Sequence, residues 1–230
     1  MIPADRMQDF SSEPLPVVAQ IHHHAAAGQQ AQILADIYQQ DINIAIWQRE
    51  LATTIYQAVN QLLILRPAFE TELILTPQDA HARVEESIDS SDTAALCEDI
   101  AELVDMFCCL FELKRVGMRL HALSGVMCPK FHEDRVPCRL VTTYQGVGTE
   151  WLPHEVVDRT KLGRGSLGLP DSQSGLYQSP GNIQQLSHGH VALLKGVLWQ
   201  GNENAGLVHR SPVTPGAGSR LLLTLDFINQ

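Results

Sequence analysis

The apolar residues of this chain change their spacing near residue 115, and this change limits the fold more than any other feature. Before it they recur at helical spacing, most clearly between Asp92 and Leu113. After it, short alternating segments are separated by glycine, proline and asparagine, which is typical of the strands of a sandwich or barrel. A chain of 230 residues can hold one sizeable domain with a helical annex. We therefore expect an α+β fold in which a helical N-terminal half packs on a C-terminal β-barrel.

The same pattern divides the chain into regions. Residues 1–28 are rich in Pro, Ser, Ala and Gln, include His22–His24, and are expected to form a flexible polar lead-in. Residues 29–114 are expected to be mainly helical, and residues 115–230 to form the barrel. Within the barrel, the long Gly- and Pro-rich stretch 153–186 is either a lid or binding loop, or a disordered surface insertion.

Local signals refine the helical region. Leu51 to Leu63 repeat at helical spacing, and Thr76-Pro77 resembles the start of a further short helix. Ile42, Ile44 and Ile46 alternate with other residues, as in a strand.

Charge and cysteine content exclude some partners and compartments. The chain carries 16 basic and 26 acidic side chains, a formal charge of −10, which argues against nucleic acid and anionic lipid surfaces. No run approaches the roughly 20 apolar residues that a membrane span needs. The 5 cysteines are odd in number and form no CxxC pair, which predicts a reducing compartment. We expect a cytoplasmic protein.

Three side chains of the barrel region form the leading candidate site. His132 and Asp134 are two residues apart, so in extended backbone both point to one face. His209 comes from a later strand. Two histidines and one carboxylate on one face hold a non-haem metal ion and leave its other positions open, as a catalytic site requires. We predict that these three residues bind a metal.

A cationic side chain follows this set. Arg220 opens the apolar last strand, where an arginine either reaches outward or meets a buried anion. Thr142 and Tyr144 share one face of an earlier strand, so we expect their hydroxyls to donate to the same anion. Arg210 is the alternative cation, although we expect it and Asp226 to form structural ion pairs.

A zinc site is the competing interpretation. Cys128 and Cys138 flank the first two ligands in a Cys-x3-His-x-Asp-x3-Cys run, which offers four zinc donors. This reading leaves His209 and Arg220 without a role. The remaining candidates, His154 and the pair His188 and His190, are expected to be loop or strand-edge histidines.

The ordered set His132, Asp134, His209 and Arg220 resembles the site of 2-oxoglutarate- and Fe(II)-dependent oxygenases. The resemblance implies a double-stranded β-helix, a jelly-roll or cupin-like barrel. It also implies that the first three residues hold Fe(II), while Arg220, assisted by Tyr144, binds the distal carboxylate of 2-oxoglutarate. It covers the C-terminal half of the chain.

A broader likeness spans most of the chain, which resembles a bacterial family known as domain-of-unknown-function family 1826. The strings that carry this resemblance are Ile44–Arg49, Cys128–Asp134, Arg139–Tyr144, Gly148–Pro153 and His209–Pro212. The genes of that family tend to occur among zinc-responsive genes, which implies a role in metal limitation without naming a reaction.

Two functions follow as hypotheses. The first is a 2-oxoglutarate-dependent dioxygenase acting on a small-molecule or protein substrate, with Trp151 and the stretch 163–181 as substrate contacts. The second is a non-catalytic metal-binding protein in zinc or iron homeostasis.

Overall fold

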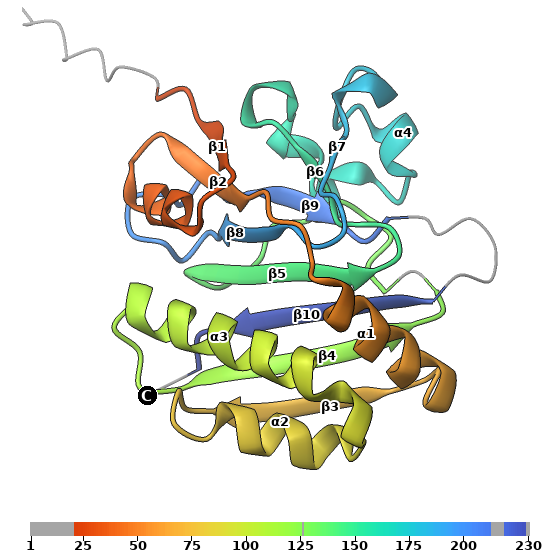
Figure 1. Ribbon diagram of the computed structural model, residues 1–230. Helices are drawn as coiled ribbons and strands as arrows, with labels where there is room; N and C mark the ends of the chain where they lie inside the picture. The colour runs from red at the N-terminus through yellow and green to blue at the C-terminus, as the bar shows by residue number, and fades with distance from the viewer. Residues whose placement is uncertain (1–20, 126, 213–218, 229–230) are drawn as a thin grey trace, which may run out of the picture.

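A seven-stranded sheet forms the centre of the protein, in a computed structural model that describes residues 21–125, 127–212 and 219–228 (Figure 1). Its strands in spatial order are β1 (His24–Gly28), β2 (Ile42–Trp47), β8 (Val191–Lys195), β5 (Cys138–Gln145), β10 (Arg220–Asp226), β4 (Val116–Leu123) and β3 (Glu70–Leu75). Every neighbouring pair is antiparallel except β1 and β2. The fold is therefore a mixed α/β arrangement around one large sheet.

Three helices cover one face of this sheet: α1 (Thr53–Leu65), α2 (Ala80–Ile88) and α3 (Ala94–Leu110) (Figure 1). The expected helices at 51–63 and 92–113 correspond to α1 and α3. The helix expected after Thr76-Pro77 begins later, at Ala80, because Thr76 and Asp79 first close a turn by exchanging side-chain hydrogen bonds with each other's backbone N–H.

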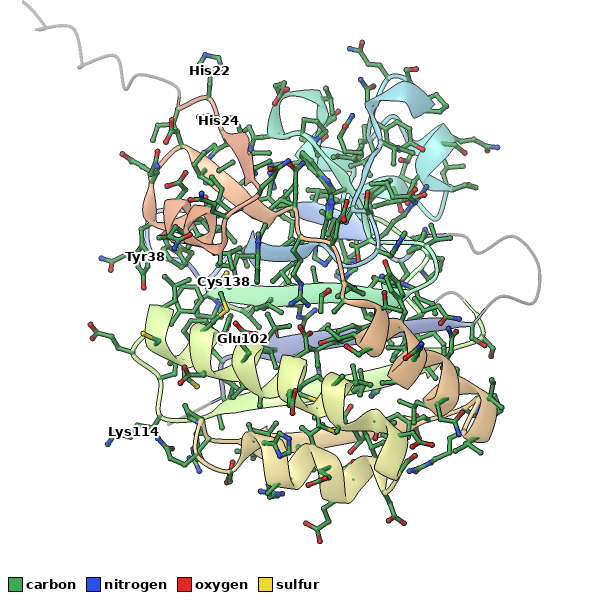
Figure 2. The ribbon with its side chains drawn as sticks, viewed as in Figure 1. His22, His24, Tyr38, Glu102, Lys114 and Cys138 are labelled. Carbon is green, nitrogen blue, oxygen red and sulfur yellow. The ribbon has the colours of Figure 1, made fainter. Side chains whose placement is uncertain are left out.

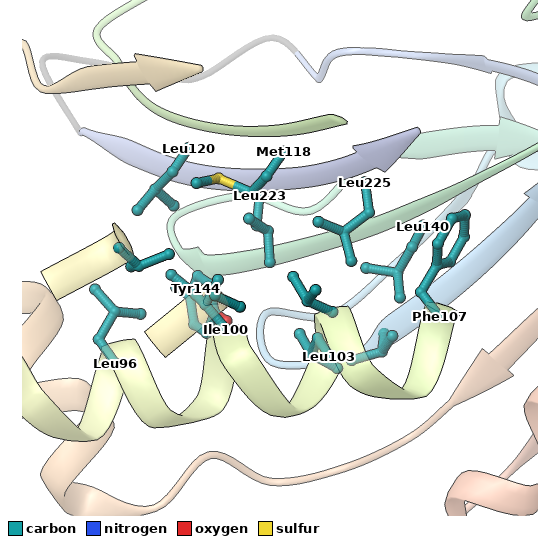
Figure 3. Close-up of a cluster of buried hydrophobic side chains, with 14 of the residues drawn as sticks. Leu96, Ile100, Leu103, Phe107, Met118, Leu120, Leu140, Tyr144, Leu223 and Leu225 are labelled. Carbon is teal, nitrogen blue, oxygen red and sulfur yellow. The ribbon is translucent and has the colours of Figure 1, made fainter. Parts of the chain in front are cut away.

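The main core lies between α3 and the sheet. Leu96, Ile100 and Leu103 recur along one face of α3 and are fully buried. They pack against strand residues that share one face of the sheet; those labelled in Figure 3 are Met118, Leu120, Leu140, Tyr144, Leu223 and Leu225. Burial of this apolar surface is the main stabilising contribution to the helical layer.

A small second sheet faces the other side of the large one. It consists of β7 (Gln184–Gln185), β6 (Glu150–Leu152) and β9 (Val208–Arg210), in that order. A separate apolar cluster packs between the two sheets: Ile44, Ile46, Val141, Leu186, Ala192, Leu194, Leu207 and Leu222. The large sheet is therefore buried on both faces over its central strands.

The stretch 153–186 is folded, which excludes the second of the two forms expected for it, a disordered insertion. It contains η3 (His154–Val156), η4 (Arg159–Lys161), η5 (Gly163–Ser166), α4 (Asp171–Ser174) and η6 (Pro180–Asn182), followed by β7. Its apolar side chains, including Leu162, Leu176 and Tyr177, pack with Phe131, Leu152 and Val208 in a third cluster. It thus folds onto the small sheet instead of forming a disordered insertion.

The expectation of a helical N-terminal half needs correction. The helices are present, but β1, β2 and β3 come from this half and join the large sheet. The strand expected at Ile42–Ile46 is β2, and the short helix η1 (Ala31–Tyr38) precedes it. Residues 24–28, assigned from sequence to a flexible lead-in, form β1, while residues 1–20 lie outside the described part. Among the described residues, no helix is both long and apolar enough to cross a membrane.

Candidate metal centre

His132 and His209 lie directly opposite each other on adjacent segments. Each backbone N–H donates to the other residue's carbonyl at 3.0 Å, which forms an isolated antiparallel bridge at the edge of the small sheet. Residues paired in this way place their side chains on the same face. The two imidazole rings accordingly lie side by side, with centroids 4.6 Å apart.

Asp134 completes this cluster. Its Oδ2 lies 3.4 Å from His209 Nε2, and its Oδ1 lies 3.7 Å from His132 Nε2. One ligand atom from each of the three residues lies within 4.8 Å of the other two. Ligands bound at about 2.0–2.2 Å from one ion are separated by roughly 3–4 Å, so the three side chains are near the spacing that one ion requires. The sequence-predicted set is therefore brought together.

Both histidines are held by the same local contact. His132 Nδ1 lies 3.0 Å from the carbonyl of Lys130, and His209 Nδ1 lies 3.1 Å from that of Leu207. A carbonyl oxygen only accepts, so Nδ1 must carry the proton in each ring. The Nε2 lone pair is then available to a metal ion, which is the usual arrangement of histidine ligands.

The site favours a charged carboxylate. Burial raises the pKa of Asp134, but its close contacts with His209 and Arg139 outweigh burial and lower that pKa to about 2. Burial and the neighbouring His209 lower the pKa of His132. Near neutral pH the cluster therefore offers a carboxylate and a neutral His132, which are the protonation states that bind a metal.

A cavity of about 100 Å³ adjoins the cluster. Its lining includes His132, His209, Arg139, Thr149 and the apolar side chains Val141, Leu194 and Leu222. No residue of the stretch 153–186 is among the residues that line it. The predicted substrate contact through residues 163–181 therefore has no support in the geometry, because that stretch packs on the third apolar cluster.

Arg220 is buried next to this cavity. Its side chain is 2% exposed, and its Nη2 donates to Thr149 Oγ1 at 2.8 Å and to Thr143 Oγ1 at 3.2 Å. Its Nε has no hydrogen-bond partner, and no carboxylate among the described residues forms an ion pair with it. Burial lowers its pKa to about 10, so it remains charged at neutral pH. A buried cation without a counter-charge is costly unless it receives an anion.

The hydroxyls beside Arg220 are not those expected from sequence. Thr142 and Tyr144 share a face, as expected, but that face points toward the helices. Tyr144 donates to Asp99 Oδ2 at 2.6 Å, and Thr142 Oγ1 is buried without a partner. Neither can assist Arg220. Thr143, on the opposite face, accepts a hydrogen bond from Arg220 instead. The alternation of side chains along the strand would have identified Thr143 if the face turned toward the small sheet had been known.

The alternative zinc site is not assembled. Cys138 is fully buried between β5 and α3, on the helical side of the sheet, as Figure 2 shows, whereas Asp134 contacts His209 and Arg139, which line the cavity on the other side. Cys128 is exposed and lines the cavity, but the ligand group found among the described residues includes neither cysteine. The two cysteines lie on opposite sides of the large sheet. Their separation is an even number of residues, but the turns between them break the strand alternation that would otherwise place both on one face.

Arg210 and Asp226 form ion pairs, as expected. Arg210 donates to Glu150 at 2.6 Å and to Asp171 at 3.3 Å, so it is not available to replace Arg220. Trp151 pairs in register with His209 and packs at the margin of the cluster between the sheets. It therefore lies on the same face of the small sheet as the metal candidates.

Of the other histidines, His121 lines the same cavity, with its Nε2 3.7 Å from Glu72 Oε1, whereas His154, His188, His22 and His24 lie elsewhere. His154 packs against His23 at 4.6 Å between centroids and accepts a hydrogen bond from Arg159, and His188 packs against Tyr56. His24 is the first residue of β1 and His22 precedes it; in Figure 2 both lie at the end of the molecule opposite α2 and α3. Among the described residues, only the His132, Asp134 and His209 group has metal-ligand spacing.

Comparison with known proteins gives one family and several distant likenesses. A family model described as "Protein of unknown function (DUF1826)" matches residues 28–226. No curated protein matches the sequence. A rice dioxygenase for auxin oxidation is 13% identical with a TM-score of 0.46, covering 90% of this chain and 83% of that one. A Caulobacter crescentus protein assigned to the 2OG-Fe(II) oxygenase family is 10% identical with a TM-score of 0.46, covering 90% and 87%. A Pseudomonas putida prolyl-4-hydroxylase is 12% identical with a TM-score of 0.43, covering 86% and 93%.

Proposed function

This chain belongs to the DUF1826 family of proteins of unknown function, and from its site we propose that it is a non-haem Fe(II), 2-oxoglutarate-dependent oxygenase. The observation that carries the proposal is the pairing of two features in one place. One is an open ligand set of two histidines and a carboxylate. The other is Arg220, a buried cation without a counter-charge, joined to the same cavity through Thr149.

The donor set fits Fe(II). Two imidazole nitrogens and one carboxylate on one side of an ion form the facial triad of non-haem iron oxygenases, and no thiolate takes part. The two facing sheets with the ligands between them agree with a double-stranded β-helix. Iron bound there would activate oxygen, and 2-oxoglutarate would supply two electrons as it is converted to succinate and carbon dioxide.

Arg220 is the proposed partner of the distal 2-oxoglutarate carboxylate. Thr143 and Thr149 accept hydrogen bonds from Nη2 and so fix the plane of the guanidinium, while Nε remains without a partner. A carboxylate arriving there receives charge-assisted hydrogen bonds in a site with little water. Val141, Leu194 and Leu222 give the adjoining cavity apolar walls. We place the substrate, a small molecule or protein, at the mouth, with Trp151 as a candidate contact.

The test is anaerobic addition of Fe(II) and then 2-oxoglutarate. We expect a visible charge-transfer band that requires both additions and disappears in His132→Ala and in Arg220→Met. In Arg220→Met, Fe(II) binding should persist, because that residue is not a ligand. As a matched control, Cys128→Ala should keep the band, since Cys128 lines the cavity without joining the ligand group.

The opposite result supports the competing function, a non-catalytic protein of zinc or iron homeostasis. In that case the wild-type protein binds Zn(II) or Fe(II) tightly, 2-oxoglutarate changes nothing, and Arg220→Met binds metal as the wild type does. This outcome would overturn the oxygenase proposal.

A further inference from the structure

We propose that Arg139, clamped by Asp226, is a positioning residue that fixes the orientation of the Asp134 carboxylate for metal binding. The inference rests on the metal centre of the proposed function and adds two residues to it. Arg139 had no predicted role, and Asp226 was expected only to form a structural ion pair.

The register of β5 and β10 places Arg139 and Asp226 next to each other, and we call this pair the clamp. Arg139 on β5 pairs directly with Asp226 on β10, so their side chains leave the sheet side by side. Arg139 Nε and Nη2 donate to the two oxygens of Asp226 at 2.7 and 2.9 Å. This two-point contact fixes the plane of the guanidinium, because it uses one complete edge of the group.

The remaining edge of the same guanidinium reaches the metal candidate. Arg139 Nη1 donates to Asp134 Oδ2 at 2.7 Å. A carboxylate engaged at one oxygen cannot rotate freely. Oδ2 is therefore held near His209 Nε2, and Oδ1 keeps a fixed direction toward His132 Nε2. Asp134 is 12% exposed at its side chain, so little water is present to take over this contact.

Other contacts hold the two ends of the clamp. The backbone carbonyl of Asp134 accepts from Val197 N at 3.1 Å, so the main chain is fixed while Arg139 fixes the side chain. Asp226 Oδ2 also accepts from Arg119 Nη1 at 3.4 Å. Groups that orient a metal ligand in this way typically change metal affinity by 10- to 100-fold when they are removed.

The geometry requires arginine. Lysine has one ammonium group and cannot hold Asp226 with a planar fork while donating in a fixed direction to Asp134. Removing the side chain would also leave two carboxylates, Asp134 and Asp226, facing one shared space without the cation between them. Either change loosens the ligand without touching His132 or His209.

The experiment measures Co(II) binding by titration calorimetry and by the visible absorption spectrum, which reports the ligand geometry. We expect Arg139→Gln to lower Co(II) affinity by about 10- to 100-fold and to alter the spectrum, and Arg139→Lys to lie between that variant and the wild type. Asp226→Asn, which keeps the shape but weakens the clamp, should lower affinity in the same direction. It decides the question if Arg139→Gln does not fold.

Arg210→Lys is the matched control. Arg210 adjoins the ligand His209, forms two ion pairs as Arg139 does, and is similarly buried, at 16% against 20% side-chain exposure. Its partners Glu150 and Asp171 belong to no metal group, so its replacement should leave Co(II) affinity and spectrum unchanged.

Two results would count against different claims. Folded Arg139 and Asp226 variants that bind Co(II) with wild-type affinity and an unchanged spectrum would overturn the positioning role alone. A wild-type protein that binds no Co(II) would overturn the metal centre, and with it the proposed function.

Discussion

Thr143 and Tyr144 are neighbours on β5, yet their hydroxyls belong to different parts of the protein. Thr143 accepts a hydrogen bond from Arg220 on the face toward the small sheet. Tyr144 donates to Asp99 on the face toward the helices, and Asp99 is also held by two hydrogen bonds from Arg49. One strand thus supports a ligand site on one side and a buried polar network on the other.

Tyr144→Phe should therefore destabilise the protein without weakening 2-oxoglutarate binding. The change removes a hydrogen bond to a buried carboxylate, which costs about 1.5–3 kcal/mol in the free energy of unfolding. Each kcal/mol lowers the melting temperature of a chain of this size by about 2–4 °C. Thermal melting and ligand titration check both parts. Loss of 2-oxoglutarate affinity in a folded Tyr144→Phe protein would contradict the placement of this hydroxyl.

Arg220→Met should have the reverse effect. Replacing a buried cation that lacks a counter-charge with an apolar side chain of similar length should raise the free energy of unfolding by on the order of 1 kcal/mol. The same change should weaken 2-oxoglutarate binding about 100-fold or more. Denaturant unfolding without ligand, followed by calorimetry with ligand, measures the two effects.

Arg49→Met is the contrast for that experiment. Arg49 is also a buried arginine, but it is paired with Asp99 at 2.6 Å. Its removal leaves a buried carboxylate without its cation, which costs about 3–5 kcal/mol. If both arginine variants lose stability equally, Arg220 has a counter-charge that the described residues do not reveal.

Gly196→Ala should displace the backbone of the candidate metal ligand Asp134. A Cβ at this position would lie 2.1 Å from the Val136 carbonyl oxygen and 2.9 Å from that of Asp134. The chain must move, at a cost of about 1–3 kcal/mol, and the movement displaces Asp134. We expect lower stability together with lower Co(II) affinity. Gly125→Ala is the control, because a Cβ there meets no atom of the described residues within 4 Å and should change neither quantity.

His154 predicts a pH dependence of stability. Burial, with the charge of Arg159, lowers its pKa from 6.5 to about 4. Between these values the unfolded chain binds a proton that the folded protein does not, so stability rises with pH. Stability should fall as the pH decreases from about 6.5 toward 4. In His154→Gln, which keeps an acceptor for Arg159, melting temperatures across this range should fall less steeply. Parallel curves for the two proteins would contradict the prediction.

The positions of the helices and strands were easier to predict from the sequence than which side chains of a strand face the helices and which face the small sheet. The helical spacing of α3 and the shared face of His132 and Asp134 follow from local patterns, because a helix repeat and an i, i+2 pair are local properties. His209 lies far along the chain, and its place in the site was predicted from its order after these two residues and from the resemblance to known oxygenases. β5 is different. Residues 140–144 are all buried, so no polar alternation indicates which side faces the helices. Thr142 and Tyr144 were therefore assigned to the wrong side, and Thr143 and Arg139 were overlooked.

The strand β1 shows a second limit. Its sequence, His-Ala-Ala-Ala-Gly, has neither the β-branched residues nor the alternation that mark a strand. Its pairing with β2 depends on tertiary contacts that a local reading does not contain. The sequence left the form of the stretch 153–186 open for a related reason, because its apolar residues are too widely spaced to show any period.

His132 and His209 are paired by their backbones but lie far apart in the sequence, so an ion bound to both side chains would cross-link two distant segments of the chain. The two residues come from segments separated by β5, β6, β8 and the whole stretch 153–186, and the three ligands meet only after those segments have folded around one another. An ion bound there stabilises the folded state in proportion to the logarithm of its free concentration. The lifetime of the protein in a cell would then follow the metal supply, and a metal-starved cell would hold less of it.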